Sequence, residues 1–171
     1  MSGMLITLGG VDKTGKSTQH KLLTERLEKE LGKRVLYLNA ANQMPPEVAL
    51  DQFRNGKYGI LGPREPGGGS PAGEKIREIA LSNAYAVTEE TRAFLMIASR
   101  SELTSRLISP LLREGHIVVC DRWTHCTEAY QHYHGGVNLG LIQQMNYFAA
   151  RGANPDLSFI TRRNHEEIID I

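Results

Sequence analysis

The sequence has few cysteines, no long apolar run and almost no net charge, and each shortage excludes a class of protein. Only two of its 171 residues are cysteines, Cys120 and Cys126, so we expect no disulfide framework and a reducing, cytoplasmic setting. No stretch approaches the roughly 18 apolar residues of a transmembrane helix, and residues 1–5 lack the basic start of a signal peptide. The net charge of +1 gives no reason to expect nucleic acid or an anionic membrane as a partner.

The residues that are present fit an ordinary globular protein. Apolar residues make up 40% of the chain and charged residues 23%, close to the usual values. A chain of this length buries a sizeable core without disulfides or metals. We therefore expect one domain over residues 1–171.

The first forty residues alternate between apolar runs and helical spacing. Residues 4–8 are a short apolar run that ends in two glycines, and residues 15–31 then repeat leucine every four positions. Residues 34–38 form a second apolar run. This order predicts a β-α-β unit and therefore an α/β fold with a parallel sheet.

The rest of the chain extends this pattern. Further strands are predicted at residues 117–120, 157–160 and 168–171. Helices are predicted near residues 46–53, 76–80, 88–107, 127–133 and 139–150, with a kink or break at Pro110 and a Gly- and Pro-rich loop over residues 59–73. A parallel neighbour needs a crossover of about a dozen residues. Because only residues 161–167 separate the last two runs, either the tail is not a parallel strand or a segment is missing before it.

One motif predicts a phosphate-binding loop. Residues 10–17 read Gly-Val-Asp-Lys-Thr-Gly-Lys-Ser, which matches the Walker A pattern, and they lie between a predicted strand and a predicted helix. Its glycines let backbone N–H groups turn inward around a phosphate, and the helix adds its positive end. Lys16 is then expected to reach the β- and γ-phosphates and Ser17 to hold Mg²⁺. The alternative is a Gly-rich turn whose lysine is merely solvated.

Asp121 and three arginines add weaker signals. Asp121 follows the apolar run 117–120, where an aspartate can help to hold Mg²⁺, although aspartates also end strands because they cap turns or helices. Arg64, Arg100 and Arg122 lie near predicted loops. Guanidinium groups bind phosphate through two hydrogen bonds, but any one of these arginines could equally be an ordinary surface charge.

Several stretches, in order along the chain, resemble the thymidylate kinase family. They are Gly-Val-Asp-Lys-Thr-Gly-Lys-Ser-Thr-Gln at 10–19, Arg-Glu-Pro-Gly-Gly at 64–68, Gly-Glu-Lys-Ile-Arg at 73–77, Ala-Ser-Arg at 98–100, Asp-Arg-Trp-Thr-His-Cys-Thr-Glu-Ala-Tyr-Gln at 121–131 and Pro-Asp-Leu at 155–157. The resemblance implies a P-loop α/β sandwich with a mostly parallel, five-stranded sheet flanked by helices. It also implies transfer of the γ-phosphoryl group of ATP to dTMP, giving dTDP and ADP.

The resemblance further implies a set of site residues. ATP would contact Gly10, Gly15, Lys16, Ser17 and Thr18, and its Mg²⁺ would lie at Ser17 and Asp121. Catalysis would rest on Asp12, Lys13, Lys16 and Arg122. The monophosphate would contact Asp12, Arg64, Met96, Arg100, Arg122, Tyr130 and Gln131, with Arg64 and Arg122 at its phosphate and Arg100 and Gln131 at the thymine edge. A homodimer packed through helices is implied as well.

Three positions depart from the family pattern, and a fourth, Lys13, differs from one branch of the family. Gly9 stands where members usually have Glu, and Cys126 replaces the usual Ser. Met96 stands where members have a Phe that stacks on thymine. Lys13 lies where one branch of the family has an arginine that stabilises the transferring phosphoryl group, and a lysine lacks its guanidinium fork.

Two segments also depart from the family. Residues 39–63 are an unusual insertion before the Arg-Glu-Pro-Gly-Gly stretch. After residue 160 the arginine-rich lid over ATP is shortened or missing, and Arg162 and Arg163 are either a remnant of it or solvated charges.

Three functions stay open on this reading. The first is an active dTMP kinase, supported by Lys16, Asp121 and Arg122. The second is a kinase for other deoxynucleoside monophosphates, because Met96 weakens the argument for thymine. The third is a degenerate nucleotide-binding module with little turnover, for which the missing lid is the best argument.

Overall fold

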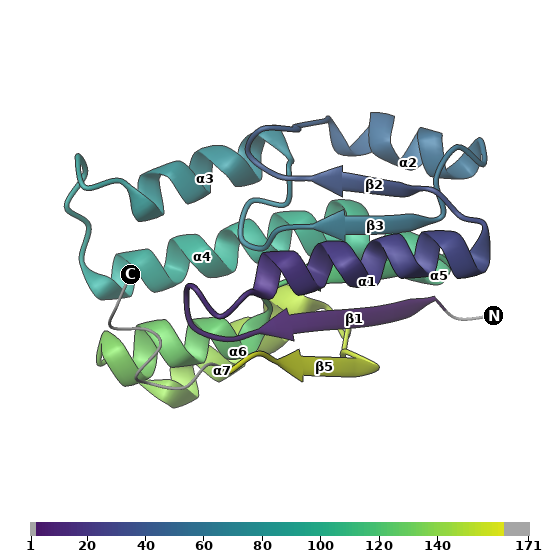
Figure 1. Cartoon of the computed structure of the whole chain (residues 1–171). Coiled ribbons are helices and arrows are strands. Elements are labelled where there is room, and N and C mark those ends of the chain that lie inside the picture. Colours follow the sequence, from purple (N-terminus) through teal and green to yellow (C-terminus); the bar gives the residue numbers. More distant parts are fainter. Residues whose placement is uncertain (1–2, 163–171) are drawn as a thin grey trace.

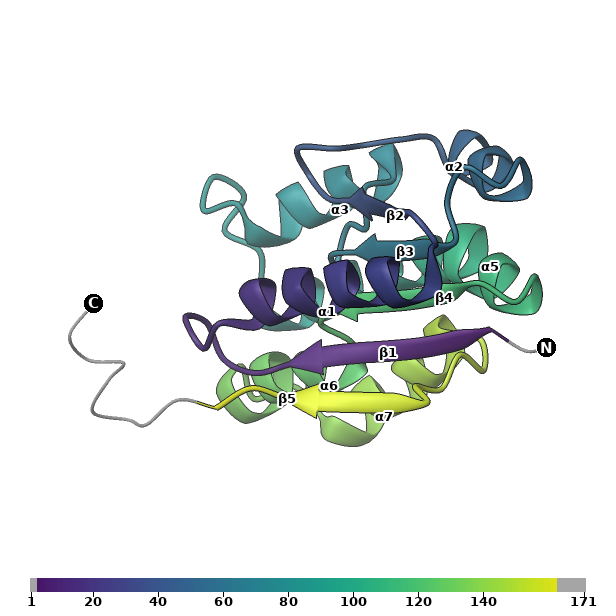
Figure 2. The same ribbon diagram turned by 45° about the vertical axis from the view of Figure 1, so that its right-hand side comes forward.

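Five parallel strands form the centre of the structure, a computed structural model that describes residues 3–162 (Figure 1 and Figure 2). The strands are β1 Met4–Gly9, β2 Val35–Leu38, β3 Ile60–Pro63, β4 Ile117–Asp121 and β5 Leu157–Ile160. Their order across the sheet is β2-β3-β4-β1-β5. The predicted α/β fold with a five-stranded parallel sheet is confirmed. β1 and β2, predicted as one β-α-β unit, are parallel but have β3 and β4 between them.

The prediction of a loop over residues 59–73 is wrong at its start, where β3 is a buried inner strand paired with both β2 and β4. Its sequence, Ile-Leu-Gly-Pro, ends in two residues that are rare in strands. Pro63 is tolerated because it occupies the last position of the strand, where the ladder ends. The strand predicted at residues 168–171 lies outside the described residues.

The helices agree with the predicted ones, and two stretches among them are π-helical. They are α1 Lys16–Leu31, α2 Pro46–Arg54, α3 Pro71–Leu81, α4 Glu89–Leu103, the π-helical turn η1 Thr104–Ile108, α5 Ser109–Arg113, α6 Thr124–Thr127, the π-helix η2 Glu128–His134 and α7 Leu139–Ala150. Thr88 caps α4 by accepting the N–H of Thr91, as expected. The disturbance predicted at Pro110 takes the form of η1, since proline lacks the N–H that an α-helical turn requires there.

Helices cover both faces of the sheet, and each face has its own core. α1 lies across one face and buries Ile6, Leu8 and Val119 of the strands (Figure 2). On the opposite face a larger cluster joins strand residues such as Val118 to side chains of α2 and of the α4–α5 stretch, including Phe53. Residues 39–63 thus contribute α2 and β3 to the core, although they look like an insertion in the sequence.

The carboxyl ends of the strands lie at one edge of the sheet, where ligands bind in open parallel sheets. β1 ends there at Gly9, β3 leads into Arg64, and β4 ends at Asp121. The motifs of the sequence therefore converge on this edge. Within residues 3–162, none of the helices has the length and apolar character needed to cross a membrane.

Candidate active site

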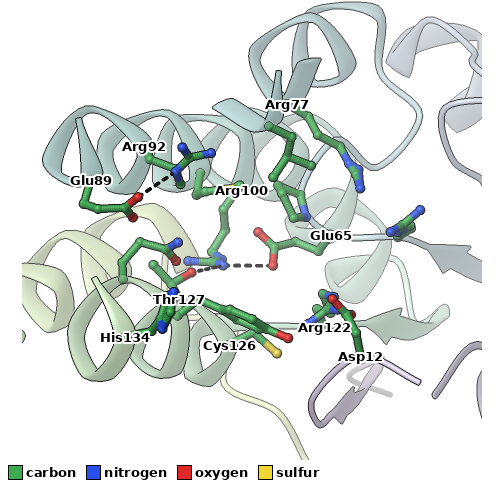
Figure 3. Close-up of a pocket in the computed structure, with 16 residues that line it drawn as sticks. Asp12, Glu65, Arg77, Glu89, Arg92, Arg100, Arg122, Cys126, Thr127 and His134 are labelled. Atoms are coloured by element: carbon green, nitrogen blue, oxygen red, sulfur yellow. Dashed lines mark hydrogen bonds and ion pairs between the residues drawn. The ribbon is translucent and has the colours of Figure 1, made fainter. Parts of the chain in front are cut away.

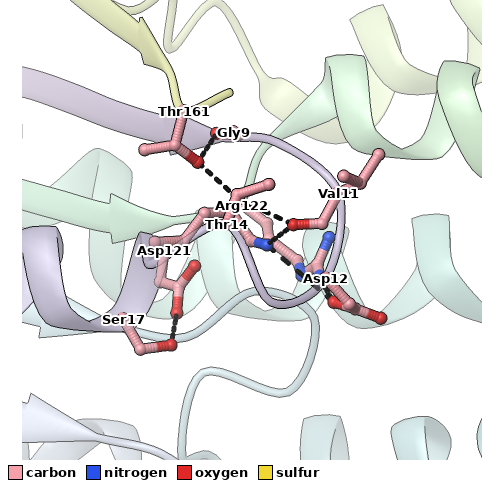
Figure 4. Close-up of polar contacts among 9 residues, drawn as sticks. Gly9, Val11, Asp12, Thr14, Ser17, Asp121, Arg122 and Thr161 are labelled. Atoms are coloured by element: carbon pink, nitrogen blue, oxygen red, sulfur yellow. Dashed lines mark hydrogen bonds and ion pairs between the residues drawn. The ribbon is translucent and has the colours of Figure 1, made fainter. Parts of the chain in front are cut away.

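The Walker A residues form a tight loop between β1 and α1. Gly10 and Gly15 have φ angles of 135° and 84°, which side chains disfavour, and a Cβ on Gly10 would lie 2.5 Å from Thr161 Oγ1. Thr14 Oγ1 donates to Val11 O at 2.8 Å and also bonds Thr161 Oγ1 at 2.7 Å (Figure 4). These contacts fix the loop against the end of β5.

A small cavity of about 230 Å³, here called the phosphate cradle, opens at this loop. It is lined by Asp12, Lys13, Gly15, Lys16, Ser17, Thr18, Arg64, Asp121 and Arg122. Lys16 Nζ donates to Val11 O at 2.5 Å and lies 3.8 Å from Asp12 Oδ1. Burial and the neighbouring charge of Arg122 lower the pKa of Lys16 below its ordinary value. The cradle thus holds converging cations at a helix N-terminus, an arrangement suited to phosphate.

Ser17 and Asp121, the two residues expected to hold Mg²⁺, lie next to each other in the wall of the cradle. Ser17 Oγ donates to Asp121 Oδ2 at 3.1 Å, while the buried Oδ1 of Asp121 has no hydrogen-bond partner among the described residues (Figure 4). A hydroxyl and an unpaired carboxylate oxygen are the hard ligands that Mg²⁺ prefers. No group of three His, Cys, Asp or Glu side chains in residues 3–162 could hold a metal by itself. The pair therefore fits Mg²⁺ that arrives with a nucleotide.

A larger cavity of about 440 Å³ continues from the cradle between β3, α3, α4 and η2 (Figure 3). It is lined by Asp12, Arg64, Glu65, Pro66, Arg77, Leu81, Glu89, Arg92, Met96, Arg100, Arg122, Cys126, Thr127, Tyr130, Gln131 and His134. Asp12, Arg64 and Arg122 line both cavities. The two cavities therefore form one site with a shared, arginine-rich junction.

Arg122 links the two sides of this junction. Its guanidinium donates to Asp12 Oδ1 of the Walker A loop and lies 5.4 Å from the ring centre of Tyr130. Arg77 joins the positive end of the large cavity, where burial and the charge of Arg64 lower its pKa. Several guanidinium groups that converge in a partly enclosed site indicate a phosphate-binding position.

Arg100 occupies the far end of the large cavity and is almost fully enclosed. Its Nη2 donates to Glu65 Oε2 and to Thr127 Oγ1, both at 2.8 Å, and its Nη1 donates to Asn146 Oδ1. The guanidinium carbon also lies 5.8 Å from the ring centre of Trp123. Four side chains from three parts of the chain thus hold this cation in one orientation.

All the residues predicted for the site except Gly10 line one of the two cavities, and Gly10 lies in the Walker A loop beside the cradle. Tyr130 and Gln131 of η2 line the large cavity together with Met96 and Arg100 of α4. Sequence reasoning missed Glu65, Arg77, Thr127 and Asn146 as site residues. The first three lie within motifs that were already recognised, which was the available signal, whereas nothing in the sequence marked Asn146.

Gly9 leaves room for a histidine from another element. A Cβ on Gly9 would lie 2.0 Å from His125 Nε2 and 2.8 Å from Ile160 Cδ1. The imidazole of His125 thus fills the space beside the end of β1, and its Nε2 is buried without a hydrogen-bond partner in the described part of the chain. Burial by itself would raise the pKa of the neighbouring Cys126 thiol. The interaction of this thiol with His125 outweighs burial, so the pKa of Cys126 is lowered.

Comparisons with known proteins agree with these observations. A family model described as thymidylate kinase matches residues 49–169. The chain is 38% identical over 161 residues to a thymidylate kinase of Pelotomaculum thermopropionicum, covering 94% of this chain and 62% of that protein. It is 35% identical over 167 residues to a thymidylate kinase of an Exiguobacterium species, covering 97% of this chain and 66% of that protein. The chain therefore spans less than two thirds of the length of either relative.

The fold is also similar to a solved structure. The crystal structure of thymidylate kinase from Ehrlichia chaffeensis superimposes with a TM-score of 0.75 at 30% sequence identity. The match covers 99% of this chain and 76% of that one.

Proposed function

The chain belongs to the thymidylate kinase family, and from this premise we propose that it transfers the γ-phosphoryl group of ATP to dTMP, giving ADP and dTDP. The supporting observation is the junction of the two cavities. Asp12, Arg64 and Arg122 line both the phosphate cradle and the large cavity. A phosphate held in one cavity therefore lies beside a phosphate held in the other, as phosphoryl transfer requires.

In this proposal the two substrates enter from opposite sides of the junction. The Walker A loop with Gly10, Gly15 and Thr18 binds the phosphates of ATP, and Lys16 neutralises their charge. The phosphate of dTMP lies between Arg64 and Arg122, and its oxygen attacks the γ-phosphorus as the bond to the β-phosphate oxygen breaks. Negative charge spreads over the transferred oxygens, so the surrounding cations stabilise the transition state more than the ground state.

Lys13 and Asp12 have distinct proposed roles at the junction. Lys13 lines the cradle with a φ angle of 63° and supplies positive charge to the transferring group. Asp12 holds Arg122 in place and lies next to the sugar and phosphate of dTMP. Ser17 and Asp121 would hold Mg²⁺, which when bound neutralises phosphate charge.

The nucleoside of dTMP fills the far end of the large cavity. Tyr130 packs against the deoxyribose, Met96 forms an apolar wall for the base, and Arg100 and Gln131 face its polar edge. Burial of Met96 in the cavity wall supports this role, although a methionine offers no ring for the base to stack on.

A panel of monophosphates tests the function. ADP release from ATP would be measured with dTMP, dUMP, dCMP, dAMP and dGMP, each at several concentrations. Preference for dTMP supports the proposal, and preference for another monophosphate supports the second function. Binding of nucleotides without ADP release would identify the chain as a nucleotide-binding module.

We also infer that the chain pairs with a second copy through α4 and α7. Exposed apolar side chains, among them Phe94, Leu141 and Phe148, line a groove of about 390 Å³ between these helices. This proposal agrees with the homodimer implied by the family resemblance. A single P-loop kinase unit over residues 1–171 and a cytoplasmic setting stay predictions.

A further inference from the structure

Two hydroxyl groups from segments far apart in the sequence meet at the Walker A loop. Thr14 Oγ1 lies 2.7 Å from Oγ1 of Thr161, the residue that follows β5 (Figure 4). Thr14 Oγ1 also lies 2.8 Å from Val11 O, and Thr161 Oγ1 lies 3.1 Å from Gly9 O. The end of β5 is thus joined to the loop through side chains, in addition to the backbone bond from Thr161 N to Gly9 O at 2.9 Å.

The distances indicate the direction of these hydrogen bonds. Each hydroxyl has a single proton, so Thr161 can donate to Thr14 or to Gly9 O but not to both. The contact with Thr14 at 2.7 Å has the usual length of an O–H···O bond, whereas Gly9 O already accepts the N–H of Thr161. The Thr161 hydroxyl therefore donates to Thr14, and the Thr14 hydroxyl in turn donates to Val11 O.

Thr14 lies between two residues with positive φ angles. Lys13 and Gly15 have φ angles of 63° and 84°. This region of backbone space is uncommon for a residue with a side chain, and it persists where surrounding contacts hold the backbone. The Thr14 hydroxyl, fixed between Thr161 and Val11 O, supplies such a contact. It therefore helps to keep Lys13 in its place in the wall of the phosphate cradle.

The carbonyl of Val11 has a second donor, which is Lys16. Lys16 Nζ donates to Val11 O at 2.5 Å, and in the proposed function it gives up this bond when it turns to the phosphates of ATP. Val11 O then keeps the hydrogen bond from Thr14. The cost of releasing Lys16 is part of the free energy of ATP binding, and a carbonyl that keeps a donor makes this cost smaller.

We propose that Thr161 is a positioning residue whose hydroxyl holds Thr14, and through Thr14 holds the Walker A loop in the form that binds ATP. This inference rests on the proposed binding of ATP at the loop. Thr161 is not among the residues that line the two cavities of the site, so it acts on the nucleotide through the loop. The two threonines are 147 positions apart, and only the pairing of β5 with β1 brings them together.

The substitution Thr161→Val tests the proposal, because valine keeps the shape of threonine and removes its hydroxyl. The dissociation constant of ATP with Mg²⁺ would be measured by isothermal titration calorimetry, and kcat and both KM values from ADP release with dTMP. We expect Thr161→Val to weaken ATP binding about threefold to tenfold and to lower kcat, because Lys13 and Lys16 are held less well. The KM for dTMP should change little. Thr161→Ser keeps the hydroxyl and should stay near the parent values.

The chain offers a matched control between the same two strands. Ser158 Oγ bonds Thr7 Oγ1 at 2.9 Å, also between β5 and β1 but within the strands and away from the loop. Ser158→Ala removes this hydroxyl pair and should leave ATP binding and kcat unchanged. Thermal unfolding of each variant shows how much the fold itself is weakened.

Thr14→Ala tests the other half of the pair. It should weaken ATP binding about as much as Thr161→Val does. In the double variant the second substitution should add little, because two residues that act through one contact are not additive. Additive losses would show that Thr161 acts without Thr14 and would overturn the inference.

Three further outcomes count against the inference. ATP binding like the parent's in Thr161→Val would overturn it, and so would a loss no larger than that in Ser158→Ala. If Thr161→Val did not fold, ATP binding like the parent's in Thr14→Ala would still overturn it. A parent that binds no ATP would remove both this inference and the proposed function. If the parent and variants bound ATP in the expected ratios but phosphorylated no monophosphate, the proposed function alone would fail.

Discussion

The Walker A loop nearly encloses Lys16, but the charge of Lys16 makes few contacts that stabilise the fold. Its ammonium group contacts only one carbonyl, that of Val11, and the exposed carboxylate of Asp12 among the contacts observed in the described residues. We expect Lys16→Ala to abolish phosphoryl transfer while the midpoint of thermal unfolding changes little. Turnover with ATP and dTMP would be measured beside an unfolding curve. Lys21→Ala, at an exposed position of the same helix, is the control, and near-normal turnover in Lys16→Ala would refute the role of the loop.

Lys13 lies in the phosphate cradle, three residues before Lys16. A cation fixed at the transferring phosphoryl group lowers the barrier, and a lysine does this less well than the forked guanidinium of arginine. We expect Lys13→Ala to lower kcat about tenfold or more, with a smaller rise in either KM, and Lys13→Arg to keep or raise kcat. Alanine and lysine share the same backbone constraint at φ 63°, so the comparison isolates the charge. Unchanged turnover in Lys13→Ala would move the catalytic cation elsewhere, for instance to Arg162.

A substitution at Arg122 tests which residues bind dTMP and which bind ATP. Because its guanidinium lies at the junction and faces Tyr130 in the large cavity, it should serve dTMP more than ATP. A hydrogen bond to a charged group contributes about 1.5–3 kcal/mol, so Arg122→Ala should raise the KM for dTMP roughly tenfold to a hundredfold and lower kcat. Titrations with each substrate decide the point, since equal losses for ATP and dTMP would contradict the assignment.

At the scale of elements, the end of β1 and α6 pack so closely that position 9 and His125 compete for the same space. His125 fills the space that a side chain at position 9 would need. We expect Gly9→Glu to lower the free energy of unfolding by about 1–3 kcal/mol through overpacking. His125→Ala in the same chain should recover part of this loss by vacating the space. Chemical denaturation of both single variants and the double variant measures the coupling, and additive effects within about 0.5 kcal/mol would show that the two positions do not interact.

At the scale of the whole molecule, the groove between α4 and α7 predicts self-association. Phe148 is 76% exposed in that groove, and an exposed apolar patch of this kind is typical of protein interfaces. We expect Phe148→Asp to shift the protein from dimer to monomer, because pairing would bury an unpaired charge. Sedimentation velocity over a range of concentrations measures this change. Tyr133→Asp, at a position 78% exposed outside the groove, should leave the mass unchanged. A parent that sediments as a monomer at all concentrations would contradict the proposal.

The sequence by itself determined the local parts of the site. Some features depend only on residues close together in the sequence, so short stretches predict them. They are the glycine spacing in the Walker A loop, the apolar runs of β1 and β4, and the capping residue Thr88. The position of Asp121 beside Ser17 also follows, because parallel strands end at one edge.

Only the tertiary structure decided which distant residues share a contact. β3 forms from Ile-Leu-Gly-Pro because burial between β2 and β4 outweighs weak strand propensity. Asn146 meets Arg100 because α7 packs against α4, and His125 fills the space at Gly9 because α6 follows β4. The unpaired oxygen of Glu65 is the clearest case. The sequence shows a glutamate in a recognised motif, but packing among elements far apart in the chain leaves its second oxygen without a partner in residues 3–162, which no local pattern encodes.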